Sequence, residues 1–153
     1  MLATVRPHSW DLALFVHVIG AMILMGGLVT AAGAGIVGWR DRAGGLRRLS
    51  ALTLFAVALP GWLIMRVGAE WVYSKEGWDK VPDKLQPTWL GIGYITADAG
   101  GVILLIALVL GGIGVRRARG GGGAALLRAS TVLAALLIAV YVVTVWAMGG
   151  KPS

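Results

Sequence analysis

The sequence predicts an all-α protein that lies in a membrane as a bundle of four transmembrane helices. Hydrophobic residues make up 58% of the chain and charged residues only 14%, whereas a soluble domain carries about 25% charged residues. Four long apolar runs follow one another, and each has the roughly 20 residues that a helix needs to cross a bilayer. The runs show no polar–apolar alternation, which favours helices over the strands of a membrane barrel.

The four runs define the helices in order and use most of the chain, so we expect residues 1–153 to form a single transmembrane domain. They cover residues 12–39, 49–71, 89–115 and 129–148. The first run contains His17 and is too long for the apolar part of a cleaved signal peptide. The second contains Arg66, the third contains Asp98, and the fourth contains no charge.

Arginine residues determine the expected orientation. The loops after the first and third runs are rich in arginine, whereas the middle loop balances its lysines with acidic residues. The arginines are Arg40, Arg42, Arg47 and Arg48 in the first loop, and Arg116, Arg117, Arg119 and Arg128 in the third. Because such loops stay in the cytoplasm, we expect residues 72–88 and both termini to lie outside. Anionic lipid then accounts for the net charge of +7, and we expect no nucleic-acid partner.

One polar or aromatic side chain from each run falls at a similar depth in the bilayer. These residues are His17, Arg66, Asp98 and Tyr141. Each lies five to nine residues from the outer end of its run, which corresponds to about 7 to 14 Å at 1.5 Å per residue. We therefore expect the four side chains to meet in a polar binding site near the outer leaflet.

Titratable groups inside a membrane are costly and face a partner or a cavity, which makes them candidates for function. Asp98 is too short to reach the headgroups, so we expect Arg66 to pair with it and His17 to be their pH-sensitive neighbour. Structural alternatives exist for each residue. Arg66 can extend to the headgroups, Asp98 can bond to Thr96, and Tyr141 can serve packing alone.

The chain has no cysteine, which excludes disulfides, iron–sulfur clusters, thiolate zinc sites and thiol catalysis. We expect no cofactor, and haem or copper held by His17 is the alternative. Copper(I) prefers imidazole and thioether ligands, and Met25 follows His17 by two helical turns, with Met22 and Met65 nearby. These two turns separate the groups by about 12 Å of rise. A bis-histidine haem would need a second protomer, because His17 is the one histidine within a run.

Glycine and proline residues predict how the helices pack and bend. Glycines are frequent in the first and third runs, where small residues let helix backbones approach closely. Pro60-Gly61 should kink or loosen the second helix. Residues 120–123 are four glycines that we interpret as a hinge, not a phosphate loop, because no Gly-Lys-Ser/Thr follows.

The segment FVHVIGAMILMGG, residues 15–27, resembles the first helix of a bacterial family of four-helix integral membrane proteins of unknown function. It is similar, more distantly, to the membrane part of CopD-type copper-resistance proteins. The matching residues are His17, Gly20 and the pair Gly26-Gly27. The resemblance implies a bacterial plasma membrane location and, for the CopD relatives, copper handling at the outer face. Met22 and Met25 stand where those families often have an aromatic residue.

The sequence therefore predicts a non-enzymatic transport, binding or accessory protein in the lipid bilayer, either a homo-oligomer or a subunit of a membrane complex. Its binding residues would be His17, Arg66, Asp98 and Tyr141. The alternative is a haem- or copper-binding membrane protein with His17 and Met25 as metal ligands. We do not expect an enzyme, because the sequence offers no activated nucleophile, metal cluster or suitably spaced pair of acids.

Overall fold

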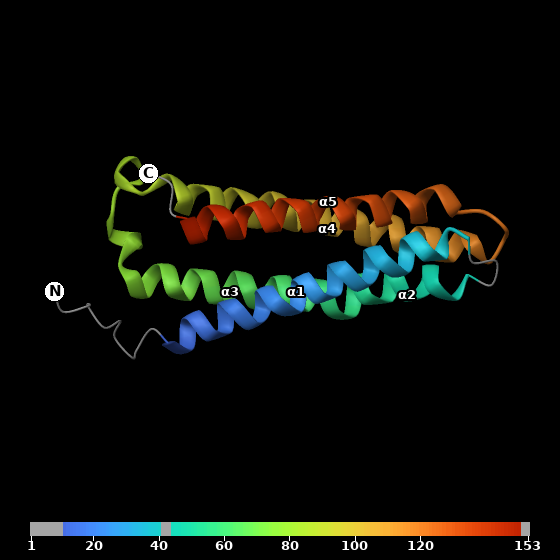
Figure 1. Cartoon of the computed structure of the whole chain (residues 1–153), viewed down its shortest axis with the longest axis horizontal. Coiled ribbons are helices and arrows are strands. Elements are labelled where there is room, and N and C mark those ends of the chain that lie inside the picture. The colour runs from blue at the N-terminus through green and yellow to red at the C-terminus, as the bar shows by residue number, and fades with distance from the viewer. Residues whose placement is uncertain (1–10, 41–43, 151–153) are drawn as a thin grey trace.

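The computed structural model describes residues 11–40 and 44–150, and within this part it is an all-α bundle without strands (Figure 1). Four helical segments are long and apolar enough to cross a membrane. They are Asp11–Gly38, Gly45–Glu76, Thr88–Ala118 and Ala124–Gly150. The predicted fold class is confirmed, and the chain is a multi-pass membrane protein. Arg42, one of the expected loop arginines, lies outside the described residues.

The described part of the chain comprises five α-helices and three short elements of other helical types. In chain order these are α1 (Asp11–Gly38), α2 (Gly45–Thr53), η2 (Leu54–Ala58), α3 (Leu59–Glu76), η3 (Trp78–Lys80), η4 (Asp83–Leu85), α4 (Thr88–Ala118) and α5 (Ala124–Gly150). The second span is continuous, because α2, η2 and α3 follow one another without a break. Both its ends extend beyond the apolar run 49–71, and α3 includes residues that we expected in the middle loop.

A π-helical turn interrupts the second span directly before Pro60. In η2 the N–H of Leu59 donates to the carbonyl of Leu54, five residues back instead of four. Proline has no N–H and its ring crowds the carbonyl four residues earlier, so the wider turn accommodates it without breaking the helix. The loosening expected at Pro60-Gly61 is therefore present, one turn earlier in the chain.

α1 packs antiparallel against α3 through glycines on both helices (Figure 1). A Cβ atom added at any of four glycines would lie within 3.0 Å of the backbone of the opposite span, which is α1 on one side and α3 with the adjoining η2 on the other. The pairs are Gly20 with Met65, Gly27 with Ala58, Gly61 with Leu24, and Gly68 with His17. Small residues allow this close approach. The resulting van der Waals contacts stabilise the helix pair in lipid, where the hydrophobic effect does not drive helices together.

α4 and α5 form a second antiparallel hairpin, in which glycines of α4 receive larger side chains of α5. Gly93 lies against Met148, Gly100 against Tyr141, and Gly114 against Leu127. These glycines are seven residues apart or multiples of seven, so they lie on one face of α4.

The two hairpins repeat one packing arrangement. Ser50 donates to the carbonyl of Ala31 in the first hairpin, and Ser130 donates to the carbonyl of Ala107 in the second, both at 2.7 Å. Between the hairpins, Gly35 of α1 meets Thr131 of α5, and Gly111 of α4 meets Ala51 of α2. The sequence does not show the repeat, because the glycine of the corresponding contact lies on different helices. In the first hairpin Gly61 of the second helix faces Leu24 of the first, whereas in the second hairpin Gly100 of the first helix faces Tyr141 of the second.

The bundle has two ends that differ in character. At the arginine end, α1 is joined to α2 and α4 is joined to α5; at the α3–α4 end, residues 77–87 connect those two helices (Figure 1). Four leucines without solvent exposure pack in the middle of the bundle: Leu28, Leu54, Leu104 and Leu137. Toward the α3–α4 end the hairpins separate, and Trp62 bridges them by donating from Nε1 to the carbonyl of Ala97 at 3.0 Å.

Candidate functional site

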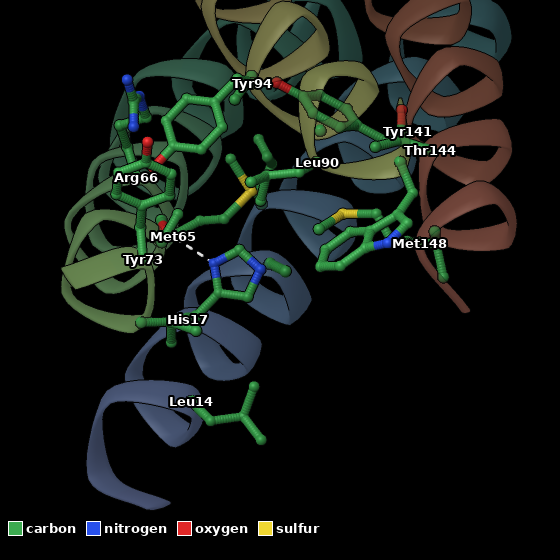
Figure 2. Close-up of a pocket in the computed structure, with 18 of the residues that line it drawn as sticks. Leu14, His17, Met65, Arg66, Tyr73, Leu90, Tyr94, Tyr141, Thr144 and Met148 are labelled. Atoms are coloured by element: carbon green, nitrogen blue, oxygen red, sulfur yellow. Dashed lines mark hydrogen bonds between the residues drawn. The ribbon is translucent and has the colours of Figure 1, made fainter. Parts of the chain in front are cut away.

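A cavity of about 380 Å³ lies between the two hairpins near the α3–α4 end. All four spanning segments contribute to its wall, and most of the lining side chains are apolar or aromatic. His17, Arg66 and Tyr141, three of the four predicted site residues, line it together (Figure 2). Asp98, the fourth, does not.

His17 is oriented by a hydrogen bond to the neighbouring helix. Its Nδ1 lies 3.0 Å from the carbonyl oxygen of Met65. A carbonyl only accepts, so Nδ1 carries the proton, and in the neutral ring Nε2 is left as an acceptor or metal ligand. Figure 2 shows this second nitrogen on the side of the ring that faces away from α3, toward the α4–α5 hairpin. Gly68 packs on the His17 backbone, which brings α1 and α3 close together at the residue that carries the ring.

Tyr141 reaches from α5 toward α4, and its hydroxyl lies over Gly100 (Figure 2). The side chain is only 6% exposed, and its hydroxyl has no hydrogen-bond partner among the described residues. A buried polar group without a partner costs about 1 to 3 kcal/mol. Tyr141 therefore places a buried donor without a partner among the described residues beside the cavity that its side chain lines.

Arg66 and Asp98 make the contact that the sequence predicts. Arg66 Nε donates to Asp98 Oδ1 at 3.1 Å, and the guanidinium also pairs with Glu70 one turn along α3. The guanidinium carbon lies 4.9 Å from the centre of the Tyr94 ring, a cation–π distance. One cation thus meets two carboxylates, and the cluster carries a formal charge of −1.

The expectation that Asp98 lies inside the bundle is wrong. Its side chain is 63% exposed, on the outer face of α4, whereas its neighbour Ala97 faces the cavity. Counting residues from the end of a run gives depth, but successive residues of a helix differ by 100° in direction. Asp98 therefore lies one residue, or about 100° around the helix, from the cavity-facing Ala97, on a face that is exposed.

Glu70 was not among the residues predicted from the sequence. It belongs to the charged cluster because it follows Arg66 by four residues, the spacing at which side chains on a helix meet. That spacing was visible in the sequence. Apart from Tyr141, nothing comparable marked the aromatic residues that line the cavity, because Tyr73, Trp78, Trp89 and Tyr94 come from three separate elements.

Residues 77–87 fold across the α3–α4 end and bring Trp78 to the cavity. Trp78 donates to Glu76 at 2.8 Å and stacks edge-to-face on Trp89, with ring centres 6.2 Å apart. The Gln86 amide donates to the Tyr73 hydroxyl at 2.9 Å and to the Val81 carbonyl at 3.0 Å. These contacts hold the segment as an ordered cap on the cavity.

The residues proposed as metal ligands do not all point to one place. Met25 lines the cavity with His17, but Met22 is 68% exposed on the outer surface of α1. Met65 and Met148 also line the cavity, so three thioethers share it with the free imidazole nitrogen. The described residues contain no group of three His, Cys, Asp or Glu side chains that could hold a metal ion. The available donor set is therefore soft, with one nitrogen and several sulfurs.

Comparison of the chain with protein-family models, with curated proteins and with solved structures finds no match.

Proposed function

We propose that the protein is a non-enzymatic membrane protein that binds a small, largely apolar ligand in the cavity between its hairpins. The observation that carries the proposal is the free Nε2 of His17, oriented into a cavity of about 380 Å³. Ligand sites typically have about 300 to 1,000 Å³ and combine apolar walls with a few fixed polar groups. Transport and accessory roles would both begin with this binding step.

The polar groups of the cavity define the class of ligand. His17 Nε2 accepts a hydrogen bond, and the Tyr141 hydroxyl can donate one. The charge of Arg66 is already matched by Asp98 and Glu70, so an anionic ligand is not favoured. The aromatic side chains of Trp78 and Trp89 suit a ring system. We therefore expect a neutral molecule with a ring that carries both a hydrogen-bond donor and an acceptor.

The orientation of the bundle is part of the proposal. The arginines support a cytoplasmic location for the arginine end. The α3–α4 end, and the cavity with it, would then lie in the outer half of the membrane, where a lipophilic ligand can enter.

A second copy of the chain or another membrane subunit would cover the charged cluster. Asp98 lies ten residues after the start of α4, about 15 Å along the helix, and its side chain is largely exposed. A carboxylate in contact with lipid at such depth costs roughly 2.5 to 3.5 kcal/mol. Contact with a partner helix would remove that cost, and this supports an oligomer or complex.

A haem- or copper-binding role is the second candidate, and one observation favours it. Metal-bound histidines almost always donate their other ring nitrogen to a carbonyl or carboxylate, as His17 does to Met65. His17 with the thioethers of Met25, Met65 and Met148 fits copper(I), and His17 alone would supply one axial ligand to haem. Copper handling would also agree with the proposed resemblance to CopD-type proteins. The bound metal would supply redox or carrier chemistry.

Purification in a mild detergent, followed by native mass spectrometry, absorbance spectroscopy and metal analysis, separates the candidates. The ligand-binding proposal expects a retained small organic molecule, no Soret band, and no stoichiometric copper. A Soret band or one copper per chain would establish the second candidate instead. The same mass spectrum gives the oligomeric state, and a monomer without any other subunit would contradict the proposed partner at Asp98.

A further inference from the structure

The cavity between the hairpins is bridged on the side of the bundle that α3 and α4 form. Trp62 donates a hydrogen bond to the backbone of α4 at 3.0 Å, and Arg66 donates to Asp98 at 3.1 Å. The rings of Tyr73 and Tyr94 meet edge-to-face, with their centres 5.2 Å apart. These contacts join the hairpins along this side, and the cap covers the end of the bundle.

The opposite side, formed by α1 and α5, becomes less covered along the bundle. Gly35 of α1 packs against Thr131 of α5 toward the arginine end. Thr131, Ile138 and Val145 lie seven residues apart, so they share this face of α5. Thr131 is 2% exposed, Ile138 is partly buried, and Val145 is 66% exposed. The face of α5 that meets α1 at the arginine end is therefore uncovered toward the other end, where the two helices separate (Figure 1).

α1 shows the same change along its matching face. Gly35, Leu28, Ala21 and Leu14 lie seven residues apart on this helix. Gly35 and Leu28 are buried, whereas Ala21 and Leu14 are partly exposed and line the cavity. Val145 lines the cavity as well, and among the described lining residues it is the one with a largely exposed side chain. The cavity therefore reaches the surface of the bundle between α1 and α5.

This opening lies along the spans and faces the hydrocarbon of the membrane. Ala21 is ten residues from the start of α1, and Val145 is five residues from the end of α5, which corresponds to about 15 and 8 Å along the helices. The walls of the opening are apolar, whereas the polar groups of His17 and Tyr141 lie in the cavity itself. A bound molecule thus meets polar groups inside and hydrocarbon at the opening.

We propose that the ligand is an amphiphile with a polar ring and a hydrocarbon chain, and that it enters from the lipid between α1 and α5. Its ring lies against His17 and Tyr141, and its chain extends past Val145 into the bilayer. The chain stays in hydrocarbon throughout, so it costs no transfer into water. This inference rests on the proposed function, because it names the ligand class and the entry route of the same cavity.

The contrasting explanation is that Val145 is an ordinary lipid-facing residue and that the cavity admits only a compact molecule. The chain offers a matched pair of positions on α5 to separate the two. Val145 is 66% exposed and lines the cavity, whereas Val143 is 61% exposed and does not line it. Tryptophan at either position adds the same bulk to the surface, but only Val145→Trp obstructs the opening. Ala21→Leu narrows the opening from the α1 side.

The experiment uses the full chain in a neutral detergent and two probes with the same polar ring, 3-ethylphenol and 3-pentadecylphenol. Their hydroxyl can donate to His17 Nε2 and accept from Tyr141. Native mass spectrometry and thermal stability measure binding. We expect the wild type to bind both probes, and the two probes to compete.

Val145→Trp and Ala21→Leu should bind 3-pentadecylphenol at least about tenfold more weakly, because the added side chain and the hydrocarbon chain overlap. Both variants should bind 3-ethylphenol within about twofold of the wild type, and Val143→Trp should bind both probes as the wild type does.

Binding of 3-ethylphenol without 3-pentadecylphenol by the wild type would overturn the inference and leave the ligand cavity in place. Equal affinity of all three variants for 3-pentadecylphenol would overturn it too, because the chain would then leave by another route. Failure of both probes to bind the wild type would contradict the proposed function itself, and the inference with it.

Discussion

The hydrogen bond between His17 and the carbonyl of Met65 determines which ring nitrogen meets the ligand cavity. Because Nδ1 is engaged, Nε2 is the group that can act on a ligand. The Met65 carbonyl comes from the helix that packs closest to α1, where Gly20 allows the backbones to approach. Packing between the helices therefore orients the functional side chain.

His17→Asn tests the role of Nε2 separately from the hydrogen bond. The amide nitrogen of asparagine can occupy the place of Nδ1 and keep the bond to Met65, but no atom replaces Nε2. We expect the variant to fold and to lose the co-purified ligand, measured by native mass spectrometry. Phe15→Leu, an exposed position two residues earlier, should keep it. Full retention of ligand by His17→Asn would show that Nε2 has no role.

Tyr141→Phe removes a buried hydroxyl that has no partner among the described residues. The ligand-free protein should keep its thermal stability or gain up to about 1 kcal/mol, because an unsatisfied group is removed. Stabilisation by the ligand should decrease. Tyr73→Phe is the matched control, since its hydroxyl accepts a hydrogen bond from Gln86, and its loss should cost about 0.5 to 1.5 kcal/mol. Destabilisation of the ligand-free protein by Tyr141→Phe would indicate an internal partner for the hydroxyl.

His17, Arg66 and Tyr141 could be found from the sequence, because titratable or aromatic groups at one depth of an apolar run are few. Asp98 was misplaced, because depth does not determine direction around a helix. Trp78 could not be found, since its place in the cavity depends on how residues 77–87 fold back over the bundle.

At the scale of elements, glycines determine how closely α1 and α3 approach. Gly20, Gly27, Gly61 and Gly68 face the partner backbone, whereas a Cβ atom added at Gly26 or Gly33, on the outer face of α1, would have nothing within 4 Å. Glycine in a helix is unfavourable by about 0.5 to 1 kcal/mol relative to alanine unless packing requires it. The two groups of glycines should therefore respond oppositely to alanine.

Gly20→Ala should destabilise the protein by about 1 to 3 kcal/mol, because its methyl group would overlap the Met65 backbone. Gly26→Ala and Gly33→Ala should be neutral or stabilising by up to about 1 kcal/mol. Thermal unfolding in detergent measures the three variants. Equal tolerance at all three positions would contradict the close packing of α1 on α3.

The sequence predicted the number and type of the helices but not their ends. Hydropathy indicates which residues can lie in the hydrocarbon core of the membrane. A helix can continue beyond those residues, because its ends depend on the backbone hydrogen bonds. α5 therefore includes Arg128, and α4 includes Arg116 and Arg117. The end of α3 is set locally instead, by Gly77, whose φ of 78° suits a helix terminus.

At the scale of the molecule, two similar hairpins pack tightly near the arginine end and separate toward the α3–α4 end. The ligand cavity follows from this arrangement, because it lies where the hairpins diverge. The two ends thus differ in chemistry, with apolar and aromatic side chains around the cavity at one end and arginines at the other.

The proposed orientation is tested by cysteine labelling, since the chain has no native cysteine. Asp79→Cys, in the cap of the α3–α4 end, should react with a membrane-impermeant maleimide added to intact cells. Arg116→Cys, at the arginine end, should react only after the membrane is permeabilised. The reverse pattern would put the ligand cavity in the inner half of the membrane.

Filling the cavity between the hairpins with a larger side chain shows whether the ligand is bound there. Ala69 lines the cavity, whereas Ala139 lies exposed on the outer face of α5. Native mass spectrometry of Ala69→Phe should show the folded protein without the molecule that the wild type retains, because the phenyl ring occupies its space. Ala139→Phe should retain that molecule in full. Equal retention by the two variants would show that the ligand binds elsewhere.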